Sequence, residues 1–367
     1  MARIVVGISG GVDSSVAAYL LKQQGHEVIG LFMINWEEDS EACTSEQDYE
    51  DVKRVCSAIG IPYYSVNYSK EYYDRVFKYF LDEYKNGRTP NPDVLCNREI
   101  KFGPFLEFAK KIGADYIATG HYCKKLEIDG ECYLAKARDL NKDQSYFLNQ
   151  ISKDQLNSVI FPLQDIDKPT VRKIANELGL VNANKKDSTG ICFIGERNFK
   201  KFLSEYLPNQ PGEIRTIDGI VVGRHDGLMY YTIGQRRGLG IGGRPDSTGE
   251  RWFVVEKDLK NNVLFVSQGE GKELFSNGLI SGKFNWITRK PDLDVFDCFA
   301  KFRYRQPDQK VRIKIDGDHI IVKFYEPQRA ITEGQYVVLY KDLENDNSIC
   351  LGGGVIEKAI FDKDLTF

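Results

Sequence analysis

The chain has few of the patterns that mark common classes of protein. Its eight cysteines form no Cys-x-x-Cys pair and it has only four histidines, so we expect no zinc site. No apolar run approaches the roughly 20 residues of a membrane helix, and no secretory signal precedes the first strand-like run. We therefore expect no membrane association, and a cytoplasmic protein with reduced thiols.

Positive charge is not in excess either, since the net charge is −3. A nucleic-acid partner would therefore need a local basic face, because the field of the whole chain does not attract phosphate. Repeats and low-complexity segments are also lacking. The 42% hydrophobic and 28% charged residues are ordinary for a globular protein, and 367 residues suggest two or three domains.

A loop rich in glycine and serine, Ser9–Ser15, directly follows the apolar run Ile4–Ile8. The order strand, glycine turn, helix start suits phosphate, because the first N–H groups of a helix lack partners within it. The Asp13 carboxylate only accepts hydrogen bonds, so beside phosphate it would hold Mg²⁺. No Gly-Lys-Ser/Thr follows, which excludes a Walker A loop. A turn without ligand is the alternative, but the density of glycine, serine and acid favours a nucleotide site.

Residues 1–120 alternate between strand-like and helix-like patterns. The predicted strands are Arg3–Ile8, Val28–Ile34, Tyr63–Val66 and Tyr116–Thr119, and the predicted helices are Ser14–Gln24, Ser45–Ile59, Glu71–Tyr84 and Glu99–Ile112. This alternation predicts a doubly wound parallel sheet with helices on both faces. Ligands of such folds bind at the carboxyl ends of the strands, where the Ser9–Ser15 loop, Met33–Trp36 and Thr119–His121 fall.

The character of the sequence changes after the linker Pro208–Gly212, where glycines and short alternating runs dominate. The spacing of these runs predicts small all-β modules, and we place one break near residue 205 and another near residue 275.

Two cysteine-bearing segments stand out. Gly87–Asn97 is polar, carries two prolines and ends near Cys96, which we expect at a helix N-terminus where thiolate is favoured. Asn91 and Asp93 either orient a substrate and move a proton or merely cap turns. Cys192 follows a polar and basic stretch, although its flanks Ile191 and Phe193 also fit a buried strand.

Three basic stretches, Asn141–Phe147, Gly234–Gly240 and Lys301–Gln306, are candidates for nucleic-acid contact. Interleaved basic and aromatic residues suit phosphate contact and base stacking, although a solvated strand face would look the same.

Taken together, these segments resemble the family of tRNA-specific 2-thiouridylases, which are ATP pyrophosphatases. The resemblance covers nearly the whole chain and includes Ser9–Ser15, Leu31–Met33, Thr89–Asn97, Ala118–Tyr122, Lys142–Phe147, Asp187–Arg197, Leu239–Gly243 and Cys350–Gly354. It implies that ATP, with Mg²⁺, adenylates the C2 oxygen of a wobble uridine in the tRNA anticodon region. A cysteine persulfide, loaded by a sulfur-donor protein, then delivers sulfur, and AMP leaves.

The resemblance implies an α/β nucleotide domain with both reactive cysteines over residues 1–204, a small central domain over 205–274 and a C-terminal β-barrel that contacts tRNA over 275–367.

The resemblance also implies residue roles. For ATP it implies Gly7, Ile8, Ser9, Gly10, Gly11, Val12, Asp13, Ser14, Met33 and Gly120, with Asp13 on Mg²⁺ through the phosphates. For the target base and tRNA it implies Asn91, Pro92, Asp93, His121, Lys142, Asp143, Gln144, Arg303, Tyr304 and Gln335. Cys192 would carry the persulfide, Cys96 would be the partner nucleophile, and the two could end as a disulfide. Asp93 would be the acid/base. We expect a monomer.

Two other functions fit parts of the pattern. Another ATP pyrophosphatase would adenylate a small-molecule carbonyl for amination, and would not need paired thiols. A nucleotide-binding RNA module would have no catalysis, and tRNA-dependent pyrophosphate exchange would exclude it.

Overall fold

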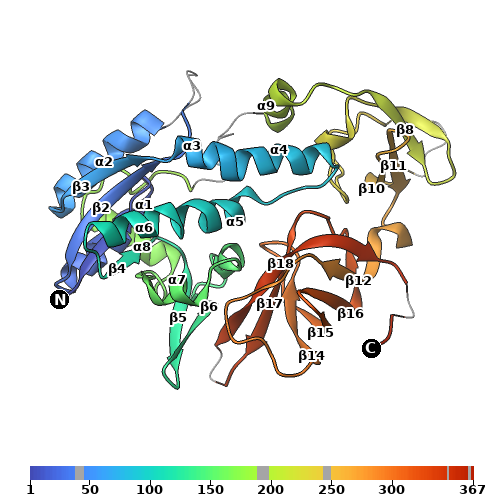
Figure 1. Cartoon of the computed structure of the whole chain (residues 1–367). Coiled ribbons are helices and arrows are strands. Elements are labelled where there is room, and N and C mark those ends of the chain that lie inside the picture. Colours follow the sequence, from blue (N-terminus) through green and yellow to red (C-terminus); the bar gives the residue numbers. More distant parts are fainter. Residues whose placement is uncertain (38–44, 188–197, 243–248, 345–346, 363–364) are drawn as a thin grey trace.

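The computed structural model describes residues 1–37, 45–187, 198–242, 249–344, 347–362 and 365–367. Three sheets follow one another along the chain: a five-stranded sheet, a four-stranded sheet and the large sheet of a barrel. Figure 1 shows the first sheet with its helices at one end of the molecule, and the other two sheets at the opposite end. The predicted order of an α/β unit, a central unit and a barrel is confirmed.

The first sheet is entirely parallel, with strand order β3-β2-β1-β4-β7. Its strands are β1 (Arg3–Gly7), β2 (Glu27–Ile34), β3 (Tyr63–Asn67), β4 (Tyr116–Ala118) and β7 (Val159–Ile160). The chain winds outward from β1 to β3 and then returns to place β4 on the other side of β1. The reversal between β1 and β4 is where doubly wound sheets bind ligands, beyond the carboxyl ends of the strands.

Helices cover both faces of this sheet. Side chains alternate between the two faces along β1, and those on each face are buried against a different set of helices. Ile4 and Val6 are buried with residues of α1 (Val12–Gln23), α2 (Ser45–Ile59) and α8 (Lys168–Glu177). Val5 is buried with residues of α3 (Ser69–Tyr72), α4 (Lys78–Lys85), α5 (Pro92–Cys96) and α6 (Pro104–Lys111). The predicted doubly wound fold is confirmed.

Glycine follows the ends of three helices of this unit. Gly25, Gly60 and Gly113 follow α1, α2 and α6 with φ between +73° and +82°, which a residue without Cβ adopts at little cost. The predicted helix over 71–84 is interrupted, because the π-turn η1 (Tyr73–Phe77) separates α3 from α4. A second π-turn, η2 (Asn97–Lys101), continues α5.

A hairpin absent from the sequence prediction leaves the first unit and joins the barrel. Its strands β5 (Cys123–Ile128) and β6 (Glu131–Lys136) pair with each other, and Ala135 of β6 pairs with Ile349 of β18 (Ser348–Ile360). The turns and helices η3 (Ser145–Leu148), α7 (Lys153–Asn157) and α9 (Phe199–Tyr206) complete this half of the chain.

The central sheet has strand order β10-β11-β8-β9, formed by β8 (Gly212–Thr216), β9 (Val221–His225), β10 (Trp252–Asp258) and β11 (Val263–Gln268). The short turns η4 (Leu228–Tyr230) and η5 (Lys272–Leu274) flank it. The barrel contains β12 (Phe275–Ser281), β14 (Val295–Lys301), β15 (Gln309–Asp316), β16 (His319–Arg329), β17 (Tyr336–Asp342) and β18, while β13 (Asn285–Trp286) pairs with β18. Pairing of β12 with both β16 and β18 closes the ring.

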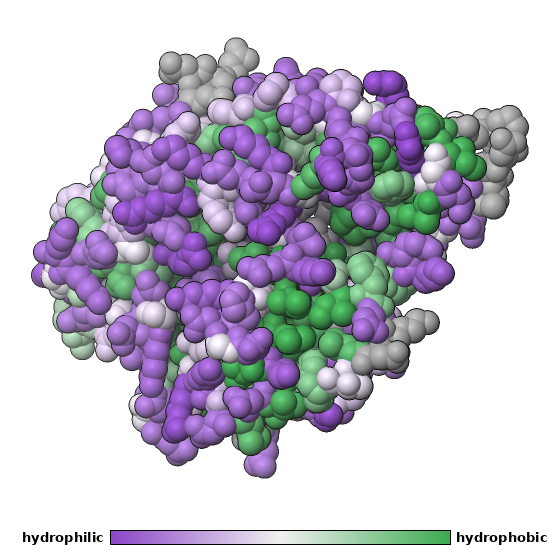
Figure 2. Space-filling model, turned by 45° about the vertical axis from the view of Figure 1, so that its right-hand side comes forward, coloured by the Kyte–Doolittle hydropathy of each residue, from purple (hydrophilic) through white to green (hydrophobic). Residues whose placement is uncertain are grey.

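Figure 2 shows one face that is mostly hydrophilic, with hydrophobic residues gathered mainly on its right-hand half. Among the residues described, no helix combines the length and the apolar character needed to span a bilayer.

Candidate functional site

The Ser9–Ser15 loop leaves β1 and opens α1. Gly10 has φ +77°, and Gly11 is the N-cap residue, with no side-chain cap from the described residues. The Ser14 hydroxyl lies 3.2 Å from the Ser9 backbone N–H, which donates to it, and itself donates to the Gly11 carbonyl at 3.1 Å. The loop is therefore held by its own serines, while the start of the helix keeps the uncapped N–H groups that bind anions.

Glycine at position 120 lets two loops meet at the β1–β4 reversal. A Cβ on Gly120 would lie only 2.7 Å from the Ser14 backbone nitrogen. On the other side of the loop, the Asn182 amide donates to the Gly10 carbonyl at 3.0 Å and to the Ser15 hydroxyl at 2.9 Å. Segments far apart in the sequence thus fix the loop from both sides.

The other residues expected at the nucleotide surround this loop. Met33 is half-buried, and its Cε lies 3.3 Å from where a Cβ on Gly7 would be. Ile8 and Val12 are buried, so only their backbone groups are available to a ligand.

Asp13 is held in place by two side chains from elsewhere in the fold. The Lys168 ammonium donates to both carboxylate oxygens, at 2.6 and 2.8 Å, and the Tyr122 hydroxyl donates to Oδ1 at 2.9 Å. Lys168 is buried at the start of α8. Burial and the nearby Asp13 charge raise the pKa of Tyr122, so its hydroxyl stays a proton donor.

A chain of charges extends from Asp13 to Asp187. Lys168 also contacts Asp187 at 2.8 Å, and Asp187 is further paired with Lys142 at 2.5 Å and Arg172 at 2.9 Å. Burial alone would raise the pKa of Asp187, but hydrogen bonds from Lys142 and Lys168 outweigh it and lower that pKa to about 2. Asp187 directly precedes residues 188–197, which carry Cys192 and lie outside the described residues.

The environment of Asp13 fits a magnesium ion carried by a nucleotide. Its side chain is one-third exposed, and Mg²⁺ is commonly bound through one or two carboxylates together with substrate phosphates. The ion would compete with Lys168 for the carboxylate, because that ammonium contacts both oxygens. Within the described residues, no cluster of three or more acidic, histidine or cysteine side chains offers a metal site independent of phosphate.

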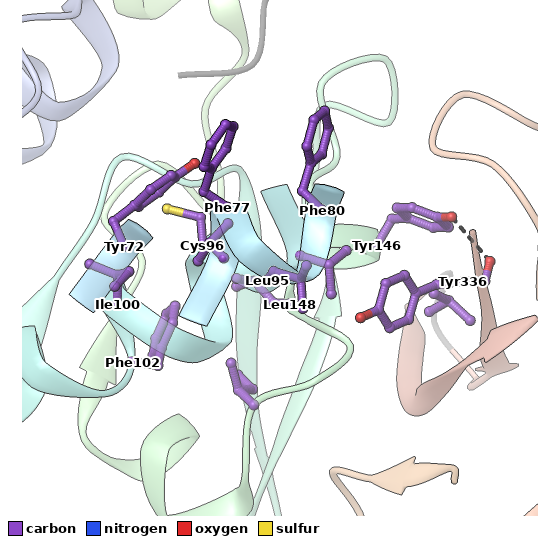
Figure 3. Packing of buried hydrophobic residues seen from close by; sticks show 14 of the residues in the cluster. Tyr72, Phe77, Phe80, Leu95, Cys96, Ile100, Phe102, Tyr146, Leu148 and Tyr336 are labelled. Atoms are coloured by element: carbon purple, nitrogen blue, oxygen red, sulfur yellow. Dashed lines mark hydrogen bonds between the residues drawn. The ribbon is translucent and has the colours of Figure 1, made fainter. Parts of the chain in front are cut away.

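Cys96 lies at the end of α5, so its predicted place at a helix N-terminus is wrong. The helix begins earlier because the Asn91 side chain accepts from the Val94 N–H at 3.2 Å and Pro92 supplies the fixed φ of a first helical residue. Figure 3 shows Cys96 among aromatic and aliphatic side chains, with its sulfur directed toward Tyr72 and Phe77. The Cys96 side chain is 2% exposed.

Asp93 is positioned on the first turn of α5, next to the prolines of the loop. Burial raises the pKa of its carboxyl, and the nearby Lys101 only partly offsets this. A carboxyl group whose pKa is raised toward neutrality is suited to proton transfer. Asn91 uses its side-chain oxygen as the cap of α5, which is the capping role expected as one of the two alternatives for this pair.

The segment Lys142–Gln144 joins the loop after β4. The Gln144 side chain accepts from the Tyr122 N–H at 3.0 Å, and its backbone N–H donates to the Tyr122 carbonyl at 2.8 Å. Asp143 is buried and accepts from Ser145 and from the Ala137 N–H. His121 is buried as well, 2.8 Å from the Thr119 hydroxyl, and burial lowers its pKa well below the usual value.

The expected barrel residues bond within the protein. The Arg303 guanidinium donates to the Ala330 carbonyl and to the Thr332 hydroxyl. The Tyr304 ring lies 4.3 Å from the ring of Phe147, measured between centroids. Gln335 donates to the carbonyl of Thr89, in the loop that leads to α5.

Sequence reasoning missed Lys168, Asn182 and the role of Tyr122. Asp167 and Pro169 around Lys168 do indicate a helix start, since the Asp167 side chain caps α8. The partner of the lysine across the fold is set by tertiary packing and leaves no local signal.

Family comparisons cover almost the whole chain. Residues 2–196 match the model described as a tRNA methyl transferase HUP domain, residues 200–268 the tRNA methyl transferase PRC-barrel domain, and residues 276–356 the aminomethyltransferase beta-barrel domain.

Two relatives that match nearly the whole chain have the same name. The chain is 59% identical over 362 residues to the tRNA-specific 2-thiouridylase MnmA of Alkaliphilus oremlandii, covering 98% of both chains. It is 60% identical over 359 residues to the protein of the same name from Listeria welshimeri, covering 97% of this chain and 94% of that one. A solved structure, the U34-tRNA thiolase NcsA from Methanococcus maripaludis, matches 56% of this chain and 63% of its own, at 18% identity and a TM-score of 0.36; so remote a likeness carries no argument.

Proposed function

The chain belongs to the family of tRNA-specific 2-thiouridylases, and we propose that it replaces the C2 oxygen of a tRNA uridine by sulfur at the expense of ATP. The uridine is the wobble base of the anticodon. The uracil C2 oxygen is a poor leaving group, because it would depart as oxide. Transfer of AMP to that oxygen releases pyrophosphate and turns the oxygen into part of a good leaving group.

The first half of the reaction takes place at the Ser9–Ser15 loop. The uncapped N–H groups at the start of α1 receive the phosphates, and Met33 and Gly120 contact the adenosine part. Bound Mg²⁺ would supply charge neutralisation on the phosphates, with Asp13 as its protein ligand. Lys168 then keeps a position between Asp13 and Asp187 from which its ammonium stabilises the same negative charge.

The second half transfers sulfur. The terminal sulfur of a Cys192 persulfide bonds to C2, and the C2–O bond breaks as AMP leaves with its electron pair. The Cys96 thiolate then attacks the Cys192 sulfur, whose bond to the transferred sulfur breaks. Two thiol sulfurs are thereby oxidised to a disulfide and the transferred sulfur is reduced to the 2-thiouridine.

Asn91, Pro92 and Asp93 receive the target base, which has to leave its stack to reach a buried site. Asp93 exchanges the proton of the ring, for which its raised pKa is suited. Lys142, Arg303 and Tyr304 supply the local basic and aromatic face that a chain of net charge −3 needs for tRNA, and Gln144 adds an amide.

One observation carries the proposal. Lys168 joins Asp13 of the nucleotide loop to Asp187, the last described residue before the Cys192 segment. The chain therefore enters its thiol-bearing segment beside the place where ATP would be activated. An amidating ATP pyrophosphatase has no need for that juxtaposition.

The test is replacement of each thiol. We expect Cys96→Ala and Cys192→Ala to abolish formation of 2-thiouridine while leaving the affinity for ATP unchanged, because neither thiol is among the residues proposed to bind the nucleotide. Cys132→Ala is the matched control, since this half-buried cysteine lies on β6 of the hairpin. Mass spectrometry of digested tRNA measures the product and separates exchange of oxygen for sulfur from addition of a methyl group.

Full thiolation by either variant would overturn the sulfur mechanism. After a single turnover of the unmodified protein, a peptide map should contain a Cys96–Cys192 disulfide. We further propose a cytoplasmic monomer that receives its sulfur from a separate persulfide-carrying protein.

A further inference from the structure

The loop between α4 and α5 belongs to the α/β unit and is held by residues of the other two units. From the central unit, the Lys257 ammonium on β10 donates to the Gly87 carbonyl at 2.8 Å. Leu259 packs against the same residue, because a Cβ on Gly87 would lie 2.7 Å from its Cδ2. The Thr232 hydroxyl lies 3.2 Å from the hydroxyl of Thr89.

The barrel holds the next residues through their backbone. The Thr89 N–H donates to the Glu333 carbonyl at 2.9 Å, and the Gln335 amide donates to the carbonyls of Thr89 at 2.8 Å and Pro90 at 3.3 Å. Gly334 lies between these two contacts with φ +91°, and a Cβ there would come within 3.0 Å of the Thr89 backbone. The backbones of Gly334 in the barrel and Thr89 in the loop are therefore too close to leave room for a side chain at position 334.

These contacts end directly before the residues proposed to receive the base. Pro90 is followed by Asn91, the cap of α5, and by Asp93 on its first turn. Proline at 90 and 92 leaves the loop few ways to relax, so a displacement at Thr89 is passed on to Asn91 and Asp93.

We propose that Lys257, together with Gln335, is a positioning residue for the base-binding turn: it fixes the loop on which Asn91 and Asp93 meet the target uridine. This rests on the proposed function. The alternative is that the same contacts only hold the three units together and have no effect on the base-binding turn. Cohesion predicts a loss of stability, whereas positioning predicts a loss of turnover with both substrates still bound.

The experiment compares Lys257→Met with Lys257→Arg in the full chain. Methionine keeps the apolar stem but has no donor, while arginine keeps a cationic donor. Lys260→Met, in the exposed turn after β10, is the matched control. The measurements are the affinity for ATP, the affinity for unmodified tRNA, and the thiolation rate with both saturating.

We expect Lys257→Met to lower the saturated rate about tenfold to 100-fold, as misplacement by about 1 Å does, with both affinities within about twofold of the original. Lys257→Arg should recover most of the rate, and Lys260→Met should equal the unmodified protein. An unchanged rate in Lys257→Met, or a slow Lys257→Arg that binds both substrates normally, would overturn the inference.

If Lys257→Met does not fold, a second variant tests the same positioning role. Thr232→Val removes only the hydroxyl that meets Thr89, and it should slow the saturated rate without changing either affinity. If it does not, the loop is not positioned from the central unit. An unmodified protein that makes no 2-thiouridine would instead contradict the proposed function, so the two failures are distinguishable.

Discussion

The Asp13 carboxylate is expected to interact with two different cations. Its carboxylate neutralises Lys168 in the protein, and it is also the acid expected to hold Mg²⁺ when ATP is bound. Asparagine is nearly isosteric and still accepts from Tyr122, but it has no charge for either cation. The variant therefore separates charge from shape.

We expect Asp13→Asn to reduce pyrophosphate release about tenfold or more when Mg²⁺ is limiting, because stabilisation of developing charge is lost. Raising the Mg²⁺ concentration should restore part of the rate. Pyrophosphate release measured across a Mg²⁺ titration checks this, with the exposed Asp82→Asn as control. Identical titration curves for Asp13→Asn and the unmodified chain would show that Asp13 is not the ligand.

At this scale the sequence predicts what is local. The Ser9–Ser15 loop is recognisable because glycine, serine and acid act through neighbouring backbone, and its serines do bond within the loop. Tyr122 and Lys168 were not predicted at Asp13, because they lie 109 and 155 positions from it in the sequence. Contacts of that separation depend on the packing of whole elements.

The elements themselves follow from periodicity and caps where those signals are strong. The helix over 45–59 and the ends of β1 to β4 are predicted to within a few residues, whereas the two-residue strand β7 is not predicted. The start of α5 differs from the prediction of a rigid loop, because Asn91 followed by Pro92 is the pattern of a capped helix. The π-turns have no established local signal, so one continuous helix was predicted over η1.

The close approach of two elements at the β1–β4 reversal gives a prediction of its own. Alanine at position 120 places a methyl group 2.7 Å from the Ser14 nitrogen and 2.9 Å from the Asp13 carbonyl carbon. Overpacking costs about 1–3 kcal/mol, so we expect Gly120→Ala to weaken ATP binding about tenfold or more. Isothermal titration with ATP measures the effect.

Gly242→Ala is the control for that substitution, because apart from its chain neighbours no atom of the described residues lies within 4 Å of its added Cβ. If Gly120→Ala binds ATP as well as Gly242→Ala does, the close approach of the two loops plays no part in forming the nucleotide site.

Across the whole molecule, the α/β unit and the barrel share buried polar contacts. The Tyr146 hydroxyl donates to the Tyr336 carbonyl at 3.0 Å, and both rings are buried (Figure 3). Tyr146→Phe leaves that carbonyl without its donor at almost unchanged volume. We expect a loss of about 1 kcal/mol in the free energy of unfolding, measured with urea.

Tyr64→Phe, on an exposed ring of β3, is the control and should leave the unfolding midpoint unchanged. Equal midpoints for the two variants would mean that the Tyr146 bond does not stabilise the junction.

At this scale the sequence predicted the order of the three units but not how they join. Glycines and short alternating runs become frequent after about residue 205, and this change predicts that a unit built of strands follows the α/β unit. The β5–β6 hairpin lies within 1–204 yet belongs to the barrel's sheet. Its alternation in Cys123–Ile128 is weak, since two lysines stand in succession, and pairing with a strand that begins at residue 348 leaves no nearby trace.

That hairpin sets an order of events on the ribosome. β6 is synthesised early, but its partner β18 emerges only after the central sheet and the other described strands of the barrel. Until β18 has emerged, the nascent α/β unit presents a strand edge that its own neighbours do not cover, and such edges promote association between chains. This edge is therefore covered only once the barrel can form, and a chain terminated before β18 keeps the edge exposed.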